Sequence, residues 1–132
     1  MAAINFQNAL GIHPDALQLR ATRSSVLANN LANSDTPGFK ARDIDFKAVL
    51  QGQMQSNKSM AVERTQPGHL SGNSNIDSEL LYRNPMQPSI DGNTVDSQIE
   101  QAMFARNAMN YNASFEFLNG KFTGLKSAIR GE

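Results

Sequence analysis

The sequence predicts a mainly α-helical protein, in which long N- and C-terminal helices pair as a coiled coil around an irregular middle segment. Apolar residues recur at helical spacing in two separate stretches, one near residues 12–31 and one near residues 95–129. Between them, residues 51–94 hold three of the five prolines and only two brief apolar clusters. Pairing the two amphipathic stretches is the simplest way to cover both apolar faces.

The first helix is expected to run for about 20 residues, from Pro14 to about Asn33. Proline suits the first turn of a helix, where its missing N–H has no intrahelical partner to lose. One face is apolar at seven-residue intervals, at Ile12, Leu19 and Val26. The run Asn33-Ser34-Asp35 and the following Pro37-Gly38 favour turns, so the helix is expected to end there.

After this turn the pattern allows two structures. Ile44 and Phe46 alternate with charged residues, as in a short strand or an extended arm with one buried face. Phe46, Val49 and Leu50 equally suit one turn of helix. Further along, the apolar clusters at 60–62 and 80–82 favour two short β-strands within the irregular segment.

The C-terminal helix is expected to span residues 95–129. Its apolar residues follow the alternating spacing of four and three that is typical of a coiled coil, at Phe104, Ala108, Tyr111, Phe115, Leu118, Phe122, Leu125 and Ile129. Either Asn93-Thr94 or a capping box at residues 97–100 would start it. Gly120 and Gly124 are costly inside a helix, which predicts either fraying or a close approach of two backbones there.

These patterns divide the chain into four parts: an N-terminal assembly helix (1–34), a turn and extended arm (35–50), an irregular variable middle (51–93) and a C-terminal assembly helix (94–132). A second apolar stripe adjoins the first on the C-terminal helix. Together the two stripes make more apolar surface than a single partner helix can cover. We therefore expect the chain to associate with copies of itself or with related proteins.

The composition argues against several classes of function. Twelve basic and twelve acidic residues cancel, so the chain has no global charge to attract nucleic acid. No apolar run is long enough for direct membrane insertion, and the N-terminus lacks the features of an ordinary signal peptide. The absence of cysteine excludes disulfides, thiolate nucleophiles and cysteine-ligated metals.

The sequence offers no catalytic, cofactor-binding or metal-binding residues. His13 and His69 have no second ligand at a spacing that suits a metal ion. Asp43 and Asp45 are closely spaced acids, but their place in an alternating stretch favours solvated or salt-bridged carboxylates over a general acid and base. No cofactor is expected, and the chain is not expected to be an enzyme.

Two segments carry a resemblance to a known family. The segment LANNLANSDTPGFKARDIDF, residues 27–46, resembles the N-terminal signature of bacterial flagellar axial proteins. The segment NPMQPSIDGNTVDSQIE, residues 84–100, is similar to the block that precedes the C-terminal helix in basal-body rod proteins. On these two blocks, about a quarter of the chain, it is identified as a member of the flagellar basal-body rod family, most similar to the proximal-rod subunits.

The resemblance implies a structural subunit of the drive shaft that transmits torque from ring to hook. It implies export through the flagellar type III apparatus without a cleaved signal peptide, and a place in the rod that spans the periplasm. The implied partners are other rod subunits, the ring-to-rod junction protein and copies of the chain itself. The alternative is a soluble export chaperone or adaptor that binds axial proteins.

The residues expected to form the assembly interface come from both helices and the turn. They are Leu19, Val26, Asn29, Asn30, Leu31, Asn33, Thr36, Pro37, Gly38, Phe39, Ile44, Phe46, Phe104, Tyr111, Phe115, Leu118, Phe122, Leu125 and Ile129. Among them, the asparagines are expected to set the register of packing at the helix end, because their amides both donate and accept hydrogen bonds.

Overall fold

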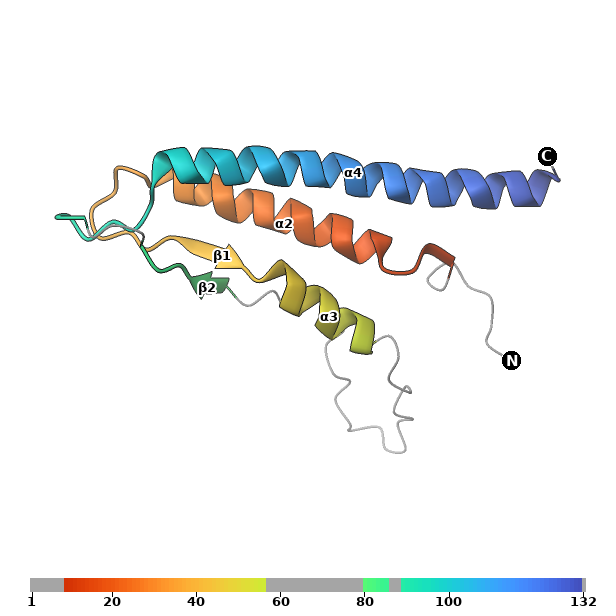
Figure 1. The fold of residues 1–132 in the computed structure, drawn as a ribbon, viewed down its shortest axis with the longest axis horizontal. Coiled ribbons are helices and arrows are strands. Elements are labelled where there is room, and N and C mark those ends of the chain that lie inside the picture. The colour runs from red at the N-terminus through yellow and green to blue at the C-terminus, as the bar shows by residue number, and fades with distance from the viewer. Residues whose placement is uncertain (1–8, 57–79, 86–88, 132) are drawn as a thin grey trace, which may run out of the picture.

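A computed structural model describes residues 9–56, 80–85 and 89–131. Its elements follow in the order α2 (His13–Ala32), β1 (Arg42–Ile44), α3 (Phe46–Ser56), β2 (Leu80–Tyr82) and α4 (Ser97–Arg130). The two long helices lie side by side, and β1, β2 and α3 lie on the side of α2 away from α4 (Figure 1). The predicted mainly α-helical fold with paired terminal helices is confirmed.

Helix α2 matches its predicted bounds to within a residue. Pro14 lies in its first turn, and the backbone N–H of Asn33 bonds back to the carbonyls of Asn29 and Asn30 at its end. Leu19 and Leu27 are fully buried. Together with Ala41 and Ile44 they are the buried hydrophobic residues in the part of the chain that the structure describes, so the apolar core is small.

Helix α4 begins at a cap that the sequence did not single out. The carboxylate of Asp96 accepts hydrogen bonds from the backbone N–H groups of Gln98 and Ile99, at 3.0 and 3.2 Å. The two predicted starts, at residues 93–94 and in a capping box at residues 97–100, were therefore wrong. Asp96 stands immediately before the helix and brings a negative charge to its positive end, which favours it as the cap.

The helix continues without interruption through Gly120 and Gly124. A Cβ atom built on either glycine meets nothing within 4 Å, so within this chain no backbone approaches them closely. Neither predicted consequence of these glycines is present in the single chain. The helix instead ends at Gly131, which has a left-handed φ of 75°.

The face of α4 that packs on α2 differs from the one predicted. Its buried residues are Glu100, Asn107 and Ser114, which are polar and seven residues apart. The predicted apolar positions are half-buried at Tyr111, Leu118 and Leu125, and exposed at Phe104, Ala108, Phe115, Phe122 and Ile129. The heptad period was correct, but its apolar stripe is turned partly to solvent because polar partners on α2 and the arm hold the polar positions inside.

The segment after the turn contains both of the structures that its pattern allowed. Residues 42–44 pair antiparallel with Leu80–Tyr82, Ile44 lying opposite Leu80, which confirms the strand expected at 80–82. Helix α3 begins immediately after Asp45, whose carboxylate accepts a hydrogen bond from the backbone N–H of Ala48 at 3.0 Å. It runs six residues past the predicted boundary at 50, and the other expected strand, at 60–62, lies outside the described residues.

Candidate assembly interface and its polar core

The turn after α2 is held by the side chain of one asparagine. The Asn93 amide donates to the carbonyls of Asn33, Ser34 and Thr36, at 3.0, 2.7 and 3.0 Å. These carbonyls lie at the end of α2, where the helix itself supplies no donors. Asn93 is buried, and its own Oδ1 accepts the N–H of Val95 at 2.8 Å.

Backbone contacts join the two segments that carry the family resemblance. Gly38, at φ 72°, donates its N–H to the carbonyl of Asp91 at 2.9 Å. The N–H of Thr94 bonds to the carbonyl of Phe39 at 3.0 Å, and the Thr94 hydroxyl accepts from the N–H of Ala41 at 2.8 Å. Residues 38–41 and 91–94, one stretch from each of the two segments, are therefore joined directly, although they are distant in sequence.

A buried asparagine of α2 makes paired hydrogen bonds with the backbone of β1, as a neighbouring strand would. The Asn30 amide donates to the carbonyl of Arg42 at 2.7 Å and accepts from the same residue's N–H at 3.1 Å. It also donates to Glu100 of α4 at 3.3 Å. Asn30 thus ties the arm to both long helices from a position that is 1% exposed.

Four charged residues form a cluster beside Asn30, with members from α2, β1, α4 and the end of β2. Asp43 accepts two hydrogen bonds from Arg23, at 2.8 and 2.9 Å, and one from Arg83 at 2.9 Å. Arg83 also bonds to Glu100, which is fully buried. The cluster alternates acid and base, so each buried carboxylate has a cationic partner.

The contact between Asp43 and Arg23 shifts the pKa of both groups. Burial acts to raise the pKa of Asp43, but the hydrogen bonds from Arg23 and the Ile44 N–H, with the charges of Arg23 and Arg83, outweigh it and leave the pKa lowered. The bond to Asp43 raises the pKa of Arg23 against the effect of burial. The Asp43 carboxylate and the Arg23 guanidinium therefore stay ionised at neutral pH. Their geometry is that of a structural salt bridge.

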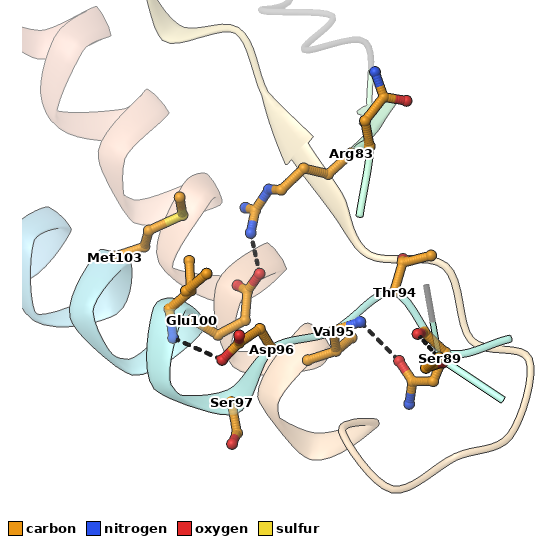
Figure 2. A pocket seen from close by; sticks show the side chains of 11 residues that line it. Arg83, Ser89, Thr94, Val95, Asp96, Ser97, Glu100 and Met103 are labelled. Atoms are coloured by element: carbon orange, nitrogen blue, oxygen red, sulfur yellow. Dashed lines mark hydrogen bonds and ion pairs between the residues drawn. The ribbon is translucent and has the colours of Figure 1, made fainter. Parts of the chain in front are cut away.

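An open pocket of about 580 Å³ lies between the residues after β2 and the start of α4. Figure 2 shows Arg83 reaching across it to Glu100, and Asp96 engaged with the helix backbone. Both acids are occupied by these bonds, and the rest of the lining includes Val95, Ile99 and Met103. The residues that the structure describes contain no group of three His, Cys, Asp or Glu that could hold a metal ion.

The structure divides the predicted interface residues into three groups. Leu19, Asn30 and Ile44 are buried within the chain. Val26, Leu31, Asn33, Phe39, Phe46, Tyr111, Leu118 and Leu125 are half-buried. Asn29, Thr36, Pro37, Gly38, Phe104, Phe115, Phe122 and Ile129 are exposed. The first group belongs to the fold of the single chain, and the third is open to a neighbour.

Sequence reasoning missed the polar residues at the centre of the molecule. Arg23, Arg83, Glu100, Asn93 and Asn107 were not among the predicted site residues, because each looks like an ordinary surface residue in its own local pattern. Only the seven-residue spacing of Glu100 and Asn107, in phase with Ser114, could have indicated a shared buried face.

Comparison with known proteins decides the family. A model described as "Flagella basal body rod protein" matches residues 10–40. The chain is 46% identical over 131 residues to the flagellar basal body rod protein FlgB of Aeromonas hydrophila, with 98% of each chain covered. It is 44% identical over 128 residues to FlgB of Cereibacter sphaeroides, covering 96% of this chain and 98% of the relative. For FlgB of Escherichia coli K12 the identity is 41% over 128 residues, covering 92% and 93%.

The chain belongs to the FlgB family of flagellar basal body rod proteins. It is a structural subunit of the flagellar basal-body rod, and the comparisons give no support to an export chaperone or adaptor. Within the described residues, none of the helices combines the length and apolarity needed to cross a bilayer.

Proposed function

We propose that the chain joins the proximal part of the rod through the exposed flank of α4, and that it does no catalysis. Phe104, Phe115 and Phe122 are 38%, 51% and 47% exposed, and Ile129 is 82% exposed. Steps of 11 and 7 residues return close to the same side of a helix, so the four residues form one continuous apolar flank. Such a flank on an isolated chain is a strong sign of a protein interface.

Further apolar side chains suggest that more than one neighbour packs on α4. Met109 and Phe117 are 65% and 64% exposed, and they lie on other sides of the helix from the flank of Phe115. Copies of the chain, other rod subunits and the ring-to-rod junction protein are the partners that we propose. A subunit inside a rod is surrounded, which agrees with a helix that is apolar on several sides.

The proposed mechanical role is to transmit torque between ring and hook. Strand β1, which belongs to the arm, and the end of β2 are bonded to both long helices. The bonds come from Asn30 and from the charged cluster of Arg23, Asp43, Arg83 and Glu100. These directional bonds resist sliding of the elements against one another. Load applied to the arm would therefore pass to both helices of the subunit.

We also propose export through the flagellar type III apparatus without a cleaved signal peptide, to the part of the rod that spans the periplasm. The small apolar core supports this route. With Leu19, Leu27, Ala41 and Ile44 as the buried hydrophobic residues of the described chain, little hydrophobic free energy opposes unfolding before transport.

Photo-crosslinking in intact cells tests the proposal. A photoreactive phenylalanine analogue replaces Phe115 or Phe122, and Asn112, which is exposed and lies on neither the flank nor the sides of Met109 and Phe117, serves as the matched control. We expect the two flank positions to crosslink to rod or ring-associated proteins in purified basal bodies, and the control position to do so less. Crosslinks confined to soluble, unassembled axial proteins would overturn the proposal and point to a chaperone.

A further inference from the structure

The contact between α2 and α4 is polar at its centre. Glu100, Asn107 and Ser114 are 1%, 0% and 8% exposed, and their seven-residue spacing places them on one side of α4. Each meets a polar group of α2. Glu100 accepts from Asn30, Asn107 donates to Arg20 and Ser24, and the Ser114 hydroxyl accepts from the Arg20 guanidinium at 2.8 Å.

Asn107 is the middle member of this row and differs from the other two. Its amide nitrogen donates to the backbone carbonyl of Arg20 at 3.0 Å and to the hydroxyl of Ser24 at 2.7 Å. Its oxygen, by contrast, has no hydrogen-bond partner, and among the described side chains it is the buried polar atom left in that state. Exchanging the two amide atoms would set oxygen against the Arg20 carbonyl, which has no hydrogen to donate, so this orientation is fixed.

We propose that Asn107 is the residue that sets the register of α2 against α4, at the expense of the stability of the pair. In the observed register both of its donated bonds reach an acceptor. A slip of one heptad would place its amide opposite residues 27 and 31, or opposite residues 13 and 17. The bond to a backbone carbonyl can re-form with Leu27 or His13, but the bond to the Ser24 hydroxyl has no counterpart in either slipped register, because Leu31 and Leu17 have no side-chain acceptor.

The unpaired oxygen explains why this arrangement is costly as well as specific. A buried polar atom without a partner gives up its hydration and gains nothing in return. An apolar side chain of similar branched shape would pack at this position without that loss, but it would pack in either register. Asparagine at a core position of a coiled coil therefore selects one pairing and weakens it.

The stability part is tested by amide hydrogen exchange on the purified full-length chain. Asn107→Leu is compared with Asn112→Leu, which makes the same change at an exposed position of the same helix. We expect Asn107→Leu to slow exchange in α2 and α4 by about fivefold or more, as removal of one unsatisfied group predicts. Exchange that is unchanged, or faster than in the Asn112→Leu control, would overturn the stability part.

The register part is tested by pulsed electron spin resonance. Because the chain has no cysteine, Ala21→Cys and Ala108→Cys place two nitroxide labels at exposed positions, one on each helix. A slip of one heptad moves one label by about 10 Å along the helix. We expect one narrow distance for the parent chain and for Asn112→Leu, and a second or broadened distance for Asn107→Leu.

A single narrow distance in Asn107→Leu, equal to that of the parent, would overturn the register part, and so would a broad distance in the parent. Asn107→Ala is measured in parallel because leucine is larger than asparagine, and its distance is expected to broaden in the same way. All of these measurements use the isolated chain, so their outcome is independent of whether the chain builds the rod.

Discussion

Removing the charge of Asp43 should release the arm from the helices. Asp43→Asn keeps the shape of the side chain, but it replaces the carboxylate that accepts two bonds from Arg23 and one from Arg83. It also leaves two arginines beside each other with only Glu100 to balance them. The substitution therefore tests the charged cluster itself and leaves the packing around it unchanged.

The expected cost follows from the degree of burial. The side chains of Asp43, Arg23 and Arg83 are 21%, 24% and 22% exposed, so the pairs are neither at the surface nor in the deep interior. Exposed pairs contribute about 0–1 kcal/mol, and breaking a buried pair costs about 3–5 kcal/mol. We expect the free energy of unfolding to fall by about 2 kcal/mol, and the midpoint of urea unfolding by about 1 M.

The pH dependence supplies a second check. Asp43 has a lowered pKa in the folded chain, against an ordinary value of about 4 in the unfolded chain. Its stabilising contribution is present in full above that ordinary value and is lost as the pH falls through the lowered one. The difference in urea midpoint between the parent and Asp43→Asn should therefore be largest near pH 6 and shrink toward pH 3.

The control is Asp45→Asn, two residues away. Asp45 is exposed and caps α3, a role that asparagine fills about as well. Its urea midpoint should stay close to that of the parent. A stabilising role of the Asp43 carboxylate is contradicted if Asp43→Asn unfolds at the same urea concentration as Asp45→Asn, or if its difference from the parent is the same at pH 3 as at pH 6.

Asn93→Ala removes the donor to three carbonyls at the end of α2, and should cost about 1–2 kcal/mol with faster amide exchange confined to residues 33–39; unaltered exchange there would contradict the cap. Gly38→Ala should lower the free energy of unfolding by about 1 kcal/mol because the φ of Gly38 is 72°. Gly120→Ala should raise the free energy of unfolding by up to about 1 kcal/mol, because a Cβ atom there meets no neighbouring atom within the chain. Urea titration of both variants tests these two expectations. Phe122→Ser should leave the free energy of unfolding within about 0.5 kcal/mol of the parent and still reduce swarming; full motility would argue against the proposed flank.

The local features of the fold could be predicted because they depend on neighbours in sequence. The bounds of α2 follow from Pro14 at its start and the turn residues after Asn33 at its end. The length of α4 follows from an unbroken heptad pattern. The cap of α4 was missed because Asp96 competes with several other good capping residues within five positions. Propensity alone does not choose among them.

The orientation of α4 could not be predicted from its pattern. An apolar stripe indicates which side of a helix avoids water, and on this basis Phe115 and Phe122 were expected to face α2. In the structure Asn107 and Glu100 face inward instead, because α2 supplies two acceptors for the Asn107 amide nitrogen, and Asn30 and Arg83 donate to Glu100. Apart from Arg83, their bonding partners lie 70 residues or more away in the sequence. A pattern read over a few helical turns cannot identify partners at that separation.

Two long helices, a strand at 80–82, a turn at Pro37-Gly38 and, through residues 27–46 and 84–100, the family could all be inferred from the amino-acid sequence. Helix periods, turn residues and motifs are local properties, and the chain encodes them directly. Three features depend on how the chain folds: the two motif segments join through Asn93, polar residues occupy the centre of the helix pair, and the aromatic flank stays open. Those outcomes depend on hydrogen-bond partners brought together by folding, because a buried polar group without a partner destabilises the fold.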